Sequence, residues 1–223
     1  MSLHGDIQVE RFHSSSLPTD SEDSSFLFSA AKNLLIDAPT VEIGLRRGGG
    51  TEAIVLGLAA AGRRGHTHLA IDPYGDIDYI SWDRISHCDY TNDMRDDALP
   101  RIRRFCAEHS INFIYLPLED TEFFERFSDG VPVYANRRKI KAEKYALVHF
   151  DGPHGVVPVT QEIEFFAARS PVGCHWVFDD PQQYNHDGIL DPWIRRLGFE
   201  LFRSRHKRWY IRVKESSLGA EVS

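Results

Sequence analysis

The sequence has little cysteine, no excess of basic charge and no long apolar run, and each shortage excludes a class of function. Its three cysteines, among 223 residues, are too widely spaced for a metal-ligand motif, which favours a reducing compartment. The net charge of −7 argues against bulk nucleic-acid binding, which needs a basic face. No stretch resembles a membrane span or a signal peptide. We therefore expect a cytoplasmic protein with neither a nucleic-acid nor a membrane partner.

The composition predicts one domain with polar ends. Residues 1–24 are rich in serine and aspartate, which is typical of a tail or a lid. Residues 25–215 are long enough to bury one sizeable core, and we expect a single domain there. Residues 216–223 are expected to form a C-terminal tail. A homo-oligomer stays open, because the N-terminal segment is also a candidate dimer arm.

Strand and helix patterns alternate along this domain. Five strand–helix units followed by a hairpin predict an α/β fold, a mostly parallel sheet with an antiparallel edge and helices on both faces. The connection over residues 72–91 is long and aromatic, and the basic run 137–141 is expected to be a solvated connection. The expected strands are 40–44, 68–71, 112–116, 145–150, 175–178, 199–204 and 208–213. The expected helices are 26–35, 50–61, one starting near Pro100, 121–127, one from Pro158 to about 170, and 189–197.

The first chemical motif is the glycine-rich turn after the strand 40–44. The segment reads VEIGLRRGGGTEAIVLGLAAAG, and the next strand ends on Asp72. In an α/β sheet this arrangement places backbone N–H groups at a helix N-terminus and a carboxylate where a ribose could lie. The pattern therefore indicates a nucleotide-like ligand. The alternative is an ordinary turn in which the glycines serve only steric needs.

The spacing of this turn narrows the ligand. The Gly-x-Gly pair of dinucleotide-binding turns is missing, and no lysine follows the glycines as in a phosphate-binding loop. The pattern Glu-x-Gly-x-x-x-Gly-x-x-Thr, starting at Glu42, resembles the first motif of class I S-adenosylmethionine-dependent methyltransferases. The resemblance implies a Rossmann-like, seven-stranded sheet and S-adenosylmethionine as cofactor, with Asp72 on the ribose. The implied cofactor-binding residues are Glu42, Gly44, Leu45, Arg46, Gly48, Gly49, Thr51, Asp72, Pro73, Tyr74 and Asp120.

Asp120 is included because of its place after the strand 112–116. In the methyltransferases that the turn resembles, this position contacts the adenine. An equally open interpretation makes Asp120 the N-cap of the helix that starts at Thr121, and one side chain could serve both purposes.

A second group of polar residues follows the strands 145–150 and 175–178. Asp151, Asp179 and Asp180 stand at the carboxyl ends of these strands, where open α/β sheets bind their ligands. Carboxylates held close together repel one another unless a cation or protons intervene. A hard divalent ion, Mg²⁺ or Ca²⁺, would satisfy them. The alternative is that single acids here form turns or helix caps.

The segments DGPH and FDD resemble the metal-binding segments of Mg²⁺-dependent O-methyltransferases that modify sugars on antibiotics. A cephalosporin-pathway protein and, more distantly, the catechol O-methyltransferases are also similar, and the likeness spans roughly residues 38–180. It implies Asp151, Asp179 and Asp180 as metal ligands, and His154, beside Asp151, as the catalytic base. The catechol enzymes have a lysine at the position of His154 and an asparagine at that of Asp180. A catechol acceptor is therefore less favoured than a sugar.

These residues predict methyl transfer to a hydroxyl of a small-molecule acceptor. A divalent ion lowers the pKa of a coordinated hydroxyl, and a histidine can take its proton near neutral pH. His154 on a surface turn, without a catalytic role, is the alternative. The aromatic residues expected to line the acceptor pocket are Tyr74, Tyr79, Trp82, Tyr90 and Tyr184. Two other functions stay open: a dinucleotide-binding oxidoreductase, and a non-catalytic protein that binds S-adenosylmethionine.

Overall fold

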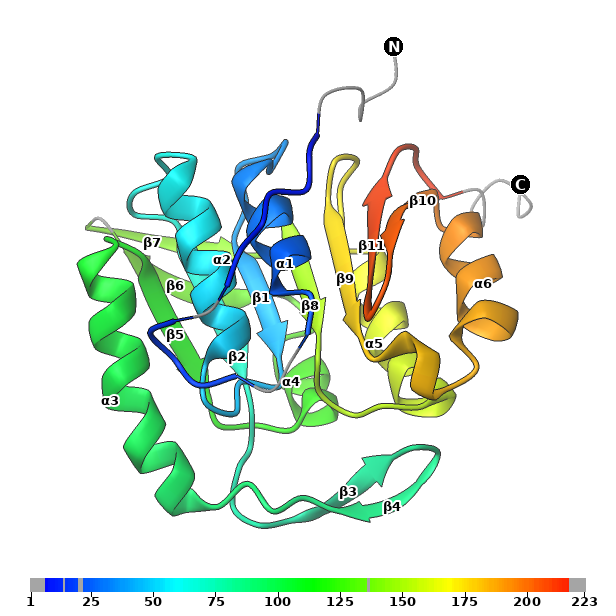
Figure 1. The fold of residues 1–223 in the computed structure, drawn as a ribbon, viewed down its shortest axis with the longest axis horizontal. Coiled ribbons are helices and arrows are strands. Elements are labelled where there is room, and N and C mark those ends of the chain that lie inside the picture. Colours follow the sequence, from blue (N-terminus) through cyan, green and yellow to red (C-terminus); the bar gives the residue numbers. More distant parts are fainter. Residues whose placement is uncertain (1–6, 14, 20–21, 136, 217–223) are drawn as a thin grey trace.

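The computed structural model describes residues 7–13, 15–19, 22–135 and 137–216. Within these residues, a seven-stranded sheet in the order β10-β11-β9-β8-β1-β2-β5 forms the centre of the molecule (Figure 1). Five neighbouring strands run parallel, and β11 pairs antiparallel with both β9 and β10. The expected α/β sheet with its C-terminal hairpin is thus confirmed. The strands are β1 (Thr40–Ile43), β2 (Thr67–Ile71), β5 (Asn112–Leu116), β8 (Leu147–Phe150), β9 (His175–Asp179), β10 (Phe199–Ser204) and β11 (Lys207–Arg212).

Two apolar clusters cover the two faces of the sheet. Successive residues of a strand point to opposite faces, so Leu69 and Ile71 join one cluster while Ala70 joins the other. The first face packs against α4 (Asp120–Arg126), α5 (Val156–Ala167) and α6 (Asp191–Arg196), and the second against α1 (Ser24–Lys32), α2 (Gly49–Ala60) and α3 (Asn92–Glu108). Short helical turns, η1 (Pro181–Gln183) and η2 (His186–Leu190), join β9 to α6. In the described part of the chain, no helix combines the length and apolarity needed to cross a membrane.

The start of α3 differs from the prediction. The helix begins at Asn92 rather than near Pro100, and Pro100 lies inside it. The hydroxyl of Thr91 caps the helix by accepting a hydrogen bond from the N–H of Met94 at 3.1 Å. Proline removes one backbone hydrogen bond, but the buried residues on both sides of it, Ala98 and Ile102, keep the helix continuous.

Two antiparallel hairpins were not predicted. The first, β3 (Asp78–Ser81) and β4 (Arg84–His87), lies in the aromatic connection and stands off the sheet at the bottom of Figure 1. Its turn residues, Trp82 and Asp83, both have positive φ, a conformation that Asn-Gly usually provides, so the sequence lacks the usual signal. The second is β6 (Val131–Ala135) with β7 (Arg138–Ala142). The basic run is therefore a strand, although four of the five residues of β7 are solvent-exposed, as expected.

The described part of the N-terminal segment is fixed on the domain. Leu17 is buried, and the consecutive backbone N–H groups of Ser15, Ser16 and Leu17 donate to the carboxylate of Glu52 at 3.0, 3.0 and 2.7 Å. Glu52 belongs to α2 and is fully buried. Residues 15–17 therefore act as a strap across the start of α2, next to the glycine-rich turn.

Candidate active site

A cavity of about 920 Å³ opens at the carboxyl edge of the parallel strands. It extends from the glycine-rich turn after β1 to the acidic residues after β8 and β9. The two chemical motifs of the sequence therefore face one shared space. The predicted site residues that line it are Gly44, Leu45, Arg46, Gly49, Asp72, Pro73, Asp120, Asp151, His154, Asp179 and Asp180.

The glycines of the glycine-rich turn lie where a side chain does not fit, as Gly44 and Gly50 show. Gly44 has a φ of +85°, and a side chain there would collide with the backbone of Asp151. A side chain on Gly50 would collide with the carboxylate of Glu42. The turn is thus pressed against the neighbouring strand and against the buried acid of its own strand, which leaves its outer surface to the cavity.

Asp72 holds this turn in place. Its Oδ2 accepts the backbone N–H groups of Leu45 and Arg46, both at 2.9 Å, and its Oδ1 accepts the N–H of Tyr74 at 3.0 Å. Asp72 is only 3% exposed, and this burial raises the pKa of its carboxyl although the three hydrogen bonds oppose the rise. The acid predicted to meet the ribose is therefore a clamp on the turn, and its contact with a ribose stays a prediction.

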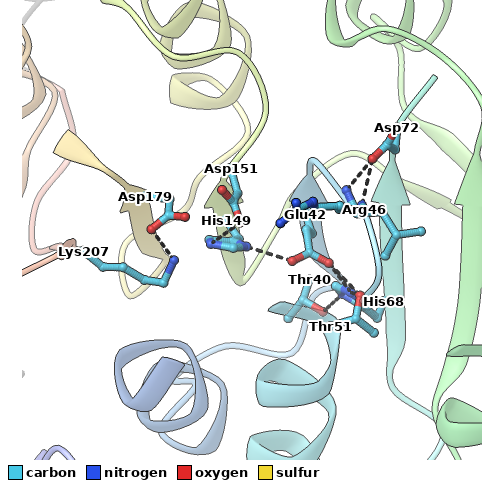
Figure 2. Close-up of polar contacts among 11 residues, drawn as sticks. Thr40, Glu42, Arg46, Thr51, His68, Asp72, His149, Asp151, Asp179 and Lys207 are labelled. Atoms are coloured by element: carbon cyan, nitrogen blue, oxygen red, sulfur yellow. Dashed lines mark hydrogen bonds and ion pairs between the residues drawn. The ribbon is translucent and has the colours of Figure 1, made fainter. Parts of the chain in front are cut away.

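Glu42 and Thr51 lie beneath the turn rather than on the cavity wall. The hydroxyl of Thr51 donates to Glu42 Oε2 at 2.6 Å, and His149 Nδ1 lies 2.9 Å from Glu42 Oε1 (Figure 2). Burial opposes ionisation of Glu42, but its hydrogen bonds with His149 and His68 prevail and lower the pKa to about 2. These two predicted cofactor residues thus support the turn from inside the protein. Gly48 and Tyr74, also predicted, are buried and do not line the cavity.

Asp120 has a free oxygen on the wall of the cavity. Its Oδ1 accepts the N–H of Thr121 at 2.8 Å, whereas its Oδ2 is buried without a hydrogen-bond partner among the described residues. Burial raises the pKa of Asp120 to about 6. The N-cap of α4 is Glu119, which forms a capping box with Glu122, so the interpretation of Asp120 as the N-cap is wrong.

The acid cluster at the other end consists of Asp151, Asp179 and His154. One ligand atom from each of these residues lies within 4.8 Å of the others. His154 Nε2 is buried and has no hydrogen-bond partner in the described part of the chain. Asp180, the third predicted metal ligand, lines the same cavity but stays outside this group, and its carboxylate accepts hydrogen bonds from Gln182 and Gln183.

Lys207 brings a positive charge into the acid cluster. Its Nζ lies 2.5 Å from Asp179 Oδ1, and the side chain is fully buried (Figure 2). Burial works against the ionised form of Asp179, but Lys207 and Asp151 outweigh it and lower the pKa of that carboxyl. The pKa of Asp151 is raised, first by burial and then by the charge of Asp179. A cation and a proton thus balance the cluster, and the cation comes from the chain itself.

The tip of the β3–β4 hairpin covers His154. The Trp82 ring stacks on the imidazole with 4.8 Å between centroids, and the backbone N–H of His154 donates to the hydroxyl of Ser81 at 2.9 Å. Burial lowers the pKa of His154, so its imidazole is neutral near pH 7. Of the predicted aromatic wall, Tyr79, Trp82 and Tyr90 line the cavity, whereas Tyr74 and Tyr184 do not. The ring of Tyr184 makes edge contacts with the rings of both Trp82 and His154.

Sequence reasoning missed His149, Lys207 and Glu52. His149 precedes Asp151 by two residues at the end of a strand, and this alternation placed it beside the acid cluster. No sequence pattern indicates that Lys207 and Glu52 are buried, because a single charged residue in a basic or apolar stretch is usually solvent-exposed.

Comparison with known proteins gives matches in structure alone. No protein-family model and no curated protein sequence matches the chain. The solved O-methyltransferase NovP superimposes with a TM-score of 0.54 at 16% identity, over 86% of this chain and 79% of that one. A calicheamicin methyltransferase gives 0.55 at 13% identity, over 85% and 76%. An O-methyltransferase from Bacillus cereus, solved with SAH, gives 0.53 at 13% identity, over 88% and 83%.

These superpositions cover most of both chains. At such low identity they establish the arrangement of the chain and not its chemistry. The sequence motifs and the superpositions agree: this chain has the fold of the solved O-methyltransferases.

Proposed function

We propose that this protein is an S-adenosylmethionine-dependent O-methyltransferase that acts on a hydroxyl of a small molecule, with a sugar as the favoured acceptor. One observation carries the proposal: a single cavity joins the glycine-rich turn to the acid cluster. Methyl transfer needs two reactants side by side, and much of its acceleration comes from holding them in line. The fold of the solved O-methyltransferases supports the same function.

S-adenosylmethionine, an electrophilic methyl donor, would occupy the end of the cavity at the glycine-rich turn. The turn leaves room beside its backbone, because Gly44 and Gly49 present no side chain. Asp120 Oδ2 is a free acceptor that suits an amino group such as that of adenine. Asp72 would fix the turn and, through the remaining acceptor capacity of its carboxylate, meet the ribose.

The acid cluster fits a divalent cation. Asp151 and Asp179 offer oxygen ligands, and an imidazole nitrogen of His154 lies within 4.8 Å of them. Asp151 and Asp179 would hold the ion, and Asp180, which lines the same cavity, is the third ligand we propose. A bound divalent ion would lower the pKa of an acceptor hydroxyl.

His154 is the residue we assign as proton acceptor. Its imidazole is neutral, stacks on Trp82 and belongs to the cavity lining, and its Nε2 has no hydrogen-bond partner among the described residues. A lone pair that takes a proton does not also bind a metal ion. The two roles of His154 are therefore mutually exclusive in one catalytic step, and they predict different metal affinities for the variant His154→Ala.

The first experiment is a calorimetric titration of the purified chain with S-adenosylmethionine, followed by methyl transfer from labelled cofactor to a panel of sugars and phenols. We expect saturable cofactor binding, and turnover of at least one acceptor. His154→Ala should keep cofactor binding and lose most turnover, whereas His87→Ala, on the exposed face of β4, should keep both. Absence of cofactor binding would refute the proposal, and binding without any transfer would favour a non-catalytic protein.

A titration with Mn²⁺ separates the two roles of His154. If His154 is the base, His154→Ala binds Mn²⁺ as the unmodified protein does. A loss of more than about tenfold in Mn²⁺ affinity would instead make His154 a ligand, with the base still to be found.

A further inference from the structure

Lys207 is a fully buried lysine on the central sheet. It is the first residue of β11, and the register of the antiparallel pair places it directly opposite Asp179 of β9. The next residues on the same side of β11, Trp209 and Ile211, belong to the apolar core. A fully buried ammonium is costly unless a carboxylate compensates it, and Asp179 does so at 2.5 Å.

The position of Lys207 changes the charge of the acid cluster. Asp151 and Asp179 of the cluster and the neighbouring Asp180 are three carboxyl groups at this end of the cavity, and Lys207 supplies one positive charge from the protein interior. Figure 2 shows the ammonium on the side of Asp179 and the carboxylate of Asp151 next to them. The ammonium therefore offsets carboxylate charge in the cluster without a bound metal.

We propose that Lys207 is an internal counter-cation that keeps the divalent-ion affinity of the acid cluster low, so that the ion exchanges freely rather than staying resident. Two physical effects support this. The ammonium repels a second cation at short range in a buried site, where charges are poorly screened. It also donates to Asp179 Oδ1, so an ion that binds this oxygen shares it with a hydrogen bond. The inference rests on the metal site proposed above but not on methyl transfer itself.

The test compares the Mn²⁺ affinity of four proteins by calorimetry, without cofactor or acceptor. Lys207→Met keeps the length of the side chain and removes its charge, and Lys207→Arg keeps the charge. Lys141→Met is the matched control, because Lys141 also pairs with an aspartate, Asp129, but on the surface. We expect Lys207→Met to bind Mn²⁺ at least about tenfold more tightly than the unmodified chain. Lys207→Arg and Lys141→Met should bind Mn²⁺ with the affinity of the unmodified chain.

Thermal unfolding gives a second readout. Without Lys207, Asp179 becomes a buried charge that a metal ion can neutralise, so the melting temperature of Lys207→Met should rise strongly with Mn²⁺ and fall with a chelator. If Lys207→Met does not fold without metal, the double variant Lys207→Met with Asp179→Asn removes both charges. It should fold and lose the tight binding.

The proposal is overturned if Lys207→Met binds Mn²⁺ no more tightly than the unmodified protein, or if no variant binds it at millimolar concentration. Titration of S-adenosylmethionine into the same variants keeps this result separate from the proposed function. Cofactor binding that survives in all of them, alongside unchanged Mn²⁺ affinity, would refute the role of Lys207 and leave the methyltransferase proposal standing.

Discussion

Replacing Asp72 by asparagine tests whether this acid acts on the turn or only on a ligand. The carboxylate accepts three backbone N–H groups, two at Oδ2 and one at Oδ1. An asparagine side chain has one acceptor oxygen, so in either orientation at least one of these three N–H groups faces an NH₂ group that accepts no hydrogen bond. The change is nearly isosteric, and any effect therefore comes from these hydrogen bonds and from the loss of the buried negative charge.

The magnitude follows from what is lost and what is regained. A hydrogen bond to a charged group contributes roughly 1.5–3 kcal/mol to stability, and a buried N–H without a partner costs about 1–3 kcal/mol. Removing a buried negative charge returns part of this, because burial raises the pKa of Asp72. We therefore expect Asp72→Asn to lower the free energy of unfolding by about 2 kcal/mol in the absence of any ligand.

The assay is urea unfolding of the ligand-free protein, combined with calorimetric titration of S-adenosylmethionine. Asp97→Asn is the control, because Asp97 pairs with Arg101 on the surface of α3 and should change stability by less than about 0.5 kcal/mol. We expect Asp72→Asn to weaken both stability and cofactor binding. A variant that is as stable as the unmodified chain would refute the clamp, and one that loses only cofactor affinity would restrict Asp72 to ligand contact.

Two other buried acids give further predictions. Burial raises the pKa of Asp120 to about 6 from an ordinary value of 3.8, so between about pH 4 and 6 the folded protein keeps a proton that the unfolded chain has released. As the pH rises from 4 to 7, the free energy of unfolding of Asp120→Asn should therefore increase by up to about 3 kcal/mol relative to that of the unmodified chain. Urea unfolding at each pH measures both proteins, and a difference that stays constant with pH would contradict this prediction. Glu52→Gln should loosen the strap of residues 15–17 and speed amide exchange there by about tenfold, and unchanged exchange would show that Leu17 alone holds the segment.

Local patterns in the sequence determined the frame of the fold. Alternating apolar strands and helices predicted every strand of the central sheet to within a few residues, and the glycine-rich turn marked the start of α2 to within one residue. These features depend on neighbours close in sequence, which is why they are readable. The α3 start and the β3–β4 hairpin were missed for the same reason, since a threonine cap far before Pro100 and a turn without glycine lack a strong local signal.

Tertiary structure alone decided which side chains contact one another in the site. Residues 107 positions apart, Glu42 and His149, meet under the turn, and residues 28 positions apart, Asp179 and Lys207, meet in the acid cluster. The sequence pattern predicted that the acids would gather at one sheet edge, but it did not indicate that β11 lies between β9 and β10. That insertion sets the register that carries a lysine into the cluster, because strand order and pairing depend on the packing of the whole sheet and not on any one segment.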